Sequence, residues 1–312
     1  MFMVKKLAIF CKSFRDDFGR IEGLISSWRK YNPEIPFVLS VPRKDGDELP
    51  GSVRRAEGIS LVFDEDYLGE DNESRFGWME QQICKLSVGE LEISENYYVI
   101  DSDSYFINRI DQEKIVGTNQ VNVLATPVDA TYTPKNVKLL DYIKNGEGLP
   151  GVNVEKADIK ELKSRLQSAY DIHKSGDSLP ARERRGYLTD IFGDPKDVKG
   201  NRLIFTPSPV FNVRILNELH NFLSSQNLNW RDAIYLSPWE YSWYGLFALR
   251  GFSEPVCAVH PTCVHFPTSE SVRHAVSIGV DESDLARRFC SIAMAARHYD
   301  QLRFGKEDPV RK

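Results

Sequence analysis

Two aspartates, one residue apart, follow directly on an apolar and aromatic run of the chain. The run is Tyr97 to Ile100, and Asp101 and Asp103 come after it. β-Branched and aromatic residues predict a buried strand, and side chains at i and i+2 of an extended chain point to the same side. Mg²⁺ and Mn²⁺ take a few carboxylate oxygens together with water and substrate phosphates. The spacing therefore predicts a metal site that binds a diphosphate, although both aspartates could instead cap the loop after the strand.

The first hundred residues alternate short apolar runs with stretches of helical spacing. The expected strands are 6–11, 37–41, 61–63 and 97–100, the expected helices are 16–30 and 76–86, and an acidic loop is expected at 64–73. Strands that alternate with helices predict an α/β fold with a mostly parallel sheet and right-handed crossovers. Ligands of such sheets bind beyond the carboxyl ends of the strands, where Asp101 and Asp103 would lie.

Beyond residue 120 the pattern is less regular. A charged stretch at 135–195 has helical spacing around 159–170 and predicts a helical insertion. We divide the chain into a domain at 1–270 and a helical tail at 271–312, with the tail helix at 282–303. Further extended segments are expected at 121–125, 202–205, 256–260 and 263–266, and further helices at 213–224 and 240–249.

Composition and charge exclude several classes of protein. The chain has 40 basic and 45 acidic residues, a net charge of -5 and no long basic tract, which argues against nucleic acid as a partner. Its five cysteines include no C-x-x-C pair, which is typical of a reducing compartment. No window approaches the roughly 20 apolar residues of a membrane-spanning helix. We expect a cytoplasmic protein that is at most peripheral to a membrane.

Blocks of sequence, in a fixed order, resemble one known family. They are LAIFCKSFRDD at 7–17, GWMEQQICKL at 77–86, IDSD at 100–103, SPWEYSWYG at 237–245 and VHF at 264–266. In these blocks the chain resembles GT-A-type glycosyltransferases. It is most similar to the bacterial glycosyltransferase-like DUF6492 family of unknown function, which is found among surface-polysaccharide genes. The fourth block carries two residues, Pro-Trp, that the family pattern lacks.

The resemblance implies a GT-A fold and a metal-dependent glycosyltransferase. Such an enzyme would move a sugar from a nucleotide-diphosphate donor, expected to be UDP-linked, to a hydroxyl of a saccharide or lipid-linked saccharide in bacterial surface-polysaccharide synthesis. Mn²⁺ or Mg²⁺ would be the cofactor. The resemblance does not extend to the insertion at 135–195, which we expect on the acceptor side, so the acceptor stays open.

The resemblance also implies which residues hold the metal. Asp103 would bind the ion directly, while Asp101 would contact the ribose or reach the ion through water. His265 would match a closing metal histidine, because neutral imidazole suits Mn²⁺ beside carboxylates. His260 competes for this role, and either histidine could instead be a hydrogen-bonded residue of the core.

Two further segments are expected to bind the donor. Lys12, Ser13 and Arg15 follow the first strand, where GT-A folds place the nucleotide, and a cation or backbone donor there would meet phosphate or ribose. This segment could instead be a solvated turn in which Ser13 caps a helix. Gln81 and Lys85 are four residues apart on one helix face and could meet sugar hydroxyls and the diphosphate. The alternative for this pair is an exposed helix face.

One carboxylate is a candidate catalytic base. Glu240 lies among aromatic residues whose packing would desolvate it and raise its pKa, and a base at this place would favour inversion at the anomeric carbon. It could also be an ordinary carboxylate at a helix N-terminus. Asp190 is a second candidate base. The basic cluster of Arg182, Arg184 and Arg185 could bind a diphosphate or an anionic acceptor, or form a solvated charged loop.

Two other functions remain open. A sugar nucleotidyltransferase also uses a Rossmann-like sheet and an aspartate-bound Mg²⁺, but such enzymes usually have a glycine-rich loop after the first strand. This chain has no glycine there before Gly19. The other alternative is a non-catalytic carbohydrate-binding protein of the same fold.

Overall fold

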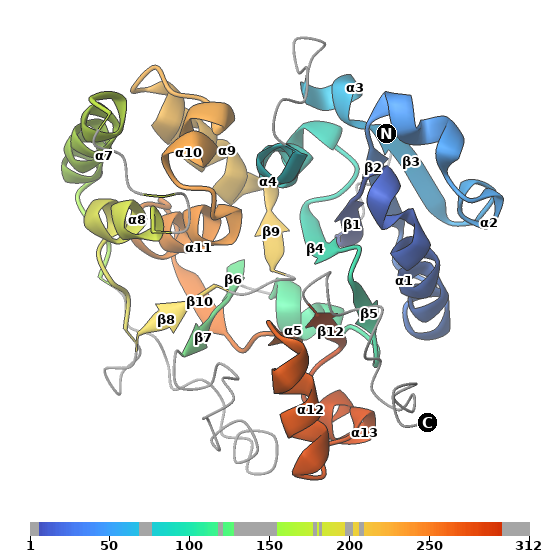
Figure 1. Cartoon of the computed structure of the whole chain (residues 1–312). Helices are drawn as coiled ribbons and strands as arrows, with labels where there is room; N and C mark the ends of the chain where they lie inside the picture. Colours follow the sequence, from blue (N-terminus) through green and yellow to red (C-terminus); the bar gives the residue numbers. More distant parts are fainter. Residues whose placement is uncertain are drawn as a thin grey trace.

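The computed structural model describes residues 6–68, 77–117, 121–127, 155–176, 180, 183–196, 202–205 and 209–294 (Figure 1). Within these ranges the central sheet has the strand order β3-β2-β1-β4-β9. Its strands are β1 (Ala8–Lys12), β2 (Phe37–Val41), β3 (Ile59–Phe63), β4 (Asn96–Asp101) and β9 (Val210–Asn212). All neighbouring pairs are parallel except β4 and β9, which are antiparallel. The predicted α/β fold with a mostly parallel sheet is therefore confirmed.

Helices cover both faces of this sheet. On one face lie α1 (Phe18–Tyr31) and the short α2 (Gly51–Arg54), and on the other lie α4 (Gly77–Leu86), α9 (Val213–Ser224), α10 (Trp230–Leu236) and α11 (Glu240–Arg250) (Figure 1). Alternate residues of β1 serve the two sides, since Ile9 packs with the α1 cluster and Phe10 with the α4 and α11 cluster. The apolar stripe predicted for the first helix is buried along its whole length, as its spacing requires.

Smaller sheets extend the fold beyond the central one. β6 (Val121–Leu124) pairs with β10 (Val256–Val259), and β7 (Thr126–Pro127) pairs with β8 (Leu203–Ile204). A third sheet has the order β11-β12-β5, with β5 (Ser104–Phe106), β11 (Cys263–Phe266) and β12 (Ser291–Met294). The remaining helices are α3 (Asp64–Leu68), α5 (Gln112–Val116), α12 (Ser269–Ser277) and α13 (Glu282–Ala286), with 3₁₀ segments at Arg15–Asp17, Arg43–Glu48 and Ser87–Leu91. In the described part of the chain no helix is both long and apolar enough to cross a membrane.

The described part of the predicted insertion is helical. It contains α7 (Ile159–Lys174) and α8 (Arg185–Phe192), whereas 135–154 lie outside the described residues. Leu162 and Leu166 of α7 and Phe192 of α8 are buried in the same apolar cluster as the sheet face and α11. These two helices therefore belong to the main core.

The predicted helical tail is wrong over part of its length. Helix α13 ends at Ala286, and the expected helix at 282–303 gives way to β12, which is parallel to β11 and antiparallel to β5. Ile292, Ala293 and Met294 are buried between these neighbours. Strand pairing and burial on both sides thus override the local helix propensity of Ala and Met. Residues 295–303 lie outside the described part, and the domain boundary at 270 stays a prediction.

The acidic loop expected at 64–73 also differs, because its first five residues form α3. Three acidic residues in a row at the start of this segment favour a helix N-terminus, where the helix dipole is positive. Residues 69–73 lie outside the described part of the chain.

Close packing of α11 against Phe205 leads to a stability prediction. A Cβ at Gly245 would lie 2.1 Å from Cδ1 of the Phe205 ring, so Gly245→Ala must displace the ring or the helix. We expect a loss of about 1–3 kcal/mol in the free energy of unfolding, measured by urea denaturation. The matched control is Gly186→Ala in α8, where the new methyl group meets no atom within 4 Å. This control should be neutral or stabilising by up to about 1 kcal/mol. Equal effects at the two sites would contradict the packing argument.

Candidate active site

A cavity of about 600 Å³ opens at the carboxyl ends of β1 and β4. It is lined by residues of α4, α8, α11, β8 and β11 as well as the sheet, so elements far apart in the sequence meet there. The parallel register sets Lys12 of β1 beside Asp101 of β4, at the edge where ligands of such sheets bind. The predicted site residues that line this cavity are Lys12, Gln81, Lys85, Asp101, Asp103, Glu240 and His265.

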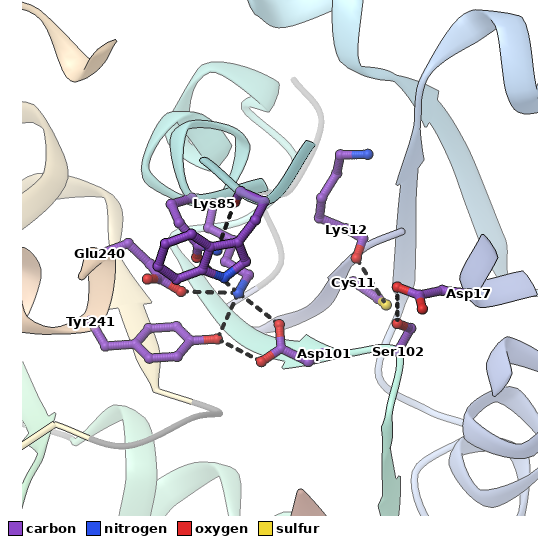
Figure 2. Close-up of polar contacts among 10 residues, drawn as sticks. Cys11, Lys12, Asp17, Lys85, Asp101, Ser102, Glu240 and Tyr241 are labelled. Carbon is purple, nitrogen blue, oxygen red and sulfur yellow. Dashed lines mark hydrogen bonds and ion pairs between the residues drawn. The ribbon is translucent and has the colours of Figure 1, made fainter. Parts of the chain in front are cut away.

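The ammonium group of Lys85 is the centre of a polar network in this cavity (Figure 2). Its Nζ lies 2.6 Å from Asp101 Oδ1 and 2.9 Å from Glu240 Oε1, and it donates to the Tyr241 hydroxyl at 3.0 Å and to Gln82 Oε1 at 3.2 Å. The Lys85 side chain is only 4% exposed. Burial alone would lower its pKa, but the carboxylates of Asp101 and Glu240 outweigh burial and raise the pKa of Lys85 well above its usual value. The site therefore holds a permanent buried cation.

This network joins three elements of the fold. Lys85 lies in the last turn of α4, Asp101 ends β4, and Glu240 begins α11, where a carboxylate is favoured by the helix dipole. Tyr241 closes the network, since its hydroxyl donates to Asp101 Oδ2 at 3.1 Å. Burial raises the pKa of Glu240, and the neighbouring Lys85 opposes that rise. Glu240 is thus the partly desolvated carboxylate that the sequence predicted, but it is also an ion-pair partner.

Asp103 also contributes a carboxyl group to the lining of this cavity. The described residues offer its side chain no hydrogen bond and no ion pair. Burial first, and the charge of Asp101 second, raise the pKa of Asp103 to about 8. Such a group favours a cation beside it, because a positive charge would stabilise its ionised form.

The residue between the two aspartates is anchored separately. The Ser102 hydroxyl donates to Asp17 Oδ2 at 3.0 Å (Figure 2), and Asp17 also pairs with Arg20. Asp17 is the last residue of the first family-like block, at 7–17. Through its bond to Ser102, Asp17 fixes the turn that follows β4, between Asp101 and Asp103.

The described residues provide only part of the ligands that a metal ion would need. Within the described ranges no three His, Cys, Asp or Glu side chains lie close enough together to hold a metal by themselves. Both oxygens of Asp101 already accept bonds, whereas the side chain of Asp103 lines the cavity with no partner among the described residues. Burial lowers the pKa of His265, which favours the neutral form of its ring. Mg²⁺ is commonly bound by one or two carboxylates with water and substrate phosphates. The residues present therefore fit a cation shared with a diphosphate, and they do not fit a closed protein cage.

Lys12 lines the cavity, but its ammonium group is engaged elsewhere. Its Nζ lies 2.9 Å from Asp64 Oδ2 and donates to the carbonyl of Ser13 at 2.5 Å. Figure 2 shows the side chain pointing away from Asp101. Ser13 itself is buried, and its hydroxyl caps no helix and finds no partner in the described residues. Direct contact of these two side chains with the donor stays a prediction.

Of the predicted residues, five do not line this cavity: Ser13, Arg15, Arg184, Asp190 and His260. Arg182 lies outside the described residues. Arg15 lines a neighbouring cavity of about 850 Å³, where it pairs with Glu48 at 3.3 Å. The two cavities share Lys12 and Gln81 among their lining residues. Asp190 is exposed on α8 and does not line either of them.

Several residues of the cavity were not singled out as site residues from the sequence. Tyr241 bridges Lys85 and Asp101, while Trp78 and Trp239 lie edge to face with ring centroids 6.0 Å apart. Tyr241 and Trp239 lie beside Glu240 in the fourth family-like block, at 237–245, and this position could have identified them as site residues. Trp78 lies in the second family-like block, at 77–86, but a tryptophan on a helix is more often a packing residue than a site residue.

Comparison with known proteins bears on the family. Among curated proteins nothing matches. The chain is similar to a solved structure of the bifunctional glycosyltransferase WbbM, with 11% identity and a TM-score of 0.41 over 93% of this chain and 45% of that one. It is also similar to TarS of S. aureus, with 11% identity and a TM-score of 0.42 over 95% of this chain and 38% of that one. The chain thus spans less than half the length of either. Residues 5–289 match DUF6492, described as a family of unknown function, and the chain therefore belongs to that family.

Proposed function

We propose that the protein is a glycosyltransferase that moves a sugar from a nucleotide-diphosphate sugar, UDP-linked, to a hydroxyl of a saccharide or lipid-linked saccharide in bacterial surface-polysaccharide synthesis. One observation carries the proposal. A single cavity at the carboxyl ends of parallel strands combines the buried ammonium group of Lys85 with the carboxyl of Asp103, which has no partner among the described residues. That combination suits a diphosphate together with a divalent cation.

The nucleotide would lie along the ends of β1, β2 and β3. The neighbouring cavity of about 850 Å³ is at this edge and has room for a base and ribose. Gln81 lines both cavities and would donate hydrogen bonds to the phosphates or the sugar. Arg15 would stand at the nucleotide end.

Mg²⁺ or Mn²⁺, held by Asp103 with Asp101 and His265 nearby, would supply neutralising charge to the departing diphosphate. The protein's own contribution is the fixed cation of Lys85, because Asp101 and Glu240 hold its ammonium group in place before substrate arrives. A preorganised charge of this kind stabilises negative charge on the leaving group as the sugar becomes oxocarbenium-like. Glu240 would take the proton of the attacking hydroxyl.

Hydrolysis of sugar nucleotides in the absence of acceptor tests the function. We expect slow release of UDP from at least one UDP-sugar with Mn²⁺ or Mg²⁺, no release with EDTA, and an upward shift of Tm with the same sugar nucleotide. Saccharide binding without any sugar-nucleotide binding would overturn the proposal in favour of a carbohydrate-binding protein. Release of pyrophosphate in place of UDP would overturn it in favour of a nucleotidyltransferase.

The role of Glu240 has its own prediction. A general base must be ionised, so the transfer rate should rise with pH through the pKa of Glu240. Burial sets this pKa above the ordinary glutamate value of about 4.3. We expect Glu240→Gln to lower kcat by roughly 10²–10⁴-fold and to remove this acid limb from the pH–rate profile. If the limb persists in the variant, Glu240 is a positioning residue for Lys85 and not the base.

A further inference from the structure

One wall of the cavity carries a cation and aromatic rings to which the proposed function assigns no contact with the donor. Arg185 begins α8, Trp239 precedes α11, and Trp78 lies in the first turn of α4. The Arg185 guanidinium lies 4.3 Å from the centre of the Trp239 ring. That ring meets Trp78 edge to face, and Trp78 is 48% exposed. Together the guanidinium and the two indoles form a row of side chains along the cavity, which we call the stack.

Burial and the nearby charge of Arg202 disfavour the positive charge of Arg185, and the carboxylate of Glu240 favours it. The described residues give Arg185 no ion pair and no hydrogen bond, and its Nε is buried without an acceptor, as is Nε1 of Trp239. The two nearby carboxylates have other partners, because Glu240 pairs with Lys85 at 2.9 Å and Asp194 pairs with Arg202 at 2.6 Å. A partly desolvated guanidinium keeps its charge and gains from any anion that reaches it.

The position of this stack separates it from the donor. Figure 1 shows α8 and α11 on one side of β4 and the strands β1, β2 and β3 on the other. The nucleotide is expected over β1 to β3, and the diphosphate at Asp103 and Lys85. The wall that carries Arg185, which is formed in part by α8 of the insertion, is therefore available for the acceptor.

We propose that Arg185, Trp239 and Trp78 form the acceptor subsite, and that the acceptor saccharide carries an oxyanion, either the carboxylate of a uronic acid or a phosphate. This inference rests on the proposed glycosyl transfer. The planar fork of arginine binds a carboxylate or phosphate through paired hydrogen bonds. The exposed indole of Trp78 offers a flat apolar surface for a sugar ring. The cation–π contact with Trp239 restricts the Arg185 side chain, so less entropy is lost when the anion binds.

Three small sugars test the charge requirement directly. Methyl β-glucuronide, methyl β-glucoside and glucose 6-phosphate are titrated at up to about 10 mM in the presence of UDP and Mg²⁺, with tryptophan fluorescence and saturation-transfer NMR as readouts. We expect one of the two anionic sugars to bind about tenfold tighter than the neutral glucoside. Preference for the glucuronide identifies a carboxylate, and preference for the phosphate identifies a phosphorylated acceptor.

Arg185→Gln should reduce the affinity for the anionic sugar to that for the neutral glucoside and leave UDP affinity unchanged. Arg185→Lys should retain part of the preference, because it keeps the charge but not the paired geometry. The control is Arg165→Gln on the exposed face of α7, where Arg165 pairs with Glu161, and it should change nothing.

Equal binding of all three sugars, or binding of none, would overturn the inference. A loss of UDP affinity in Arg185→Gln would also overturn it, because Arg185 would then serve the donor while the proposed function stands. Failure of the unaltered protein to bind UDP is a separate result, which removes the proposed function itself.

Discussion

Asp103→Asn is expected to lower sugar-nucleotide hydrolysis by about 10³-fold or more while the protein stays folded. The amide keeps the shape of the carboxyl group but cannot supply the negative charge that a divalent cation needs, and charge stabilisation of this kind is worth several kcal/mol in the transition state. The Tm increase produced by Mn²⁺ together with UDP should disappear in the variant, since it depends on binding to the folded protein. An exposed control, Asp171→Asn on α7, should retain full activity.

The same variant makes a signed prediction for stability without metal. The pKa of Asp103 is raised to about 8 in the folded protein from an ordinary value near 3.8. A folded-state pKa above the unfolded one means that the stability contributed by the protonated carboxyl is present below about pH 4 and is lost as the pH rises toward 8. Asparagine does not titrate, so the variant should gain Tm relative to the unaltered protein between pH 5 and pH 8 in EDTA. An unchanged difference across this range would contradict the burial of a lone acid.

Local signals in the sequence predict four of the five described strands of the central sheet, and β9 (Val210–Asn212) was not predicted. The strand at Phe37–Val41 and the helix at Val213–Ser224 have the predicted bounds, because each is defined by an uninterrupted apolar pattern. The neighbourhood of Lys12 and Asp101 follows from the rule that parallel strands end at one edge. These features depend only on periodicity and on the order of elements.

Features that depend on distant pairing could not be predicted in this way. Lys85 and Glu240 are 155 residues apart, and no property of either segment indicates that the two side chains meet. Strand β12 has a helix-favouring composition and becomes a strand only because β11 and β5 leave a place between them. Arg185 is one of several arginines in a charged stretch, and only the folded chain shows that the described residues give it no ion pair. Each of these residues takes its role from elements that pack around it.

Lys85→Met is expected to have the largest effect on stability. The substitution keeps a side chain of similar length and removes the one cation that Asp101 and Glu240 share. The Glu240 side chain is 5% exposed and would be left as a buried carboxylate without a partner. Removing one member of a buried ion pair typically destabilises a protein by about 3–5 kcal/mol. We expect a loss of that order in urea unfolding at pH 7, together with loss of sugar-nucleotide hydrolysis.

A double variant distinguishes the loss of charge balance from a loss of packing. Glu240→Gln in the Lys85→Met background removes the unpaired carboxylate, so the double variant should recover part of the stability that the single variant loses. The pH dependence provides a second check, since protonation of Glu240 should relieve the Lys85→Met defect as the pH falls toward 5. If the double variant is less stable than Lys85→Met at every pH, the network acts through packing, and its cation has no separate role in holding α4, β4 and α11 together. Recovery of stability without recovery of hydrolysis would show that the ammonium group of Lys85 is needed for the reaction itself and not only for the fold.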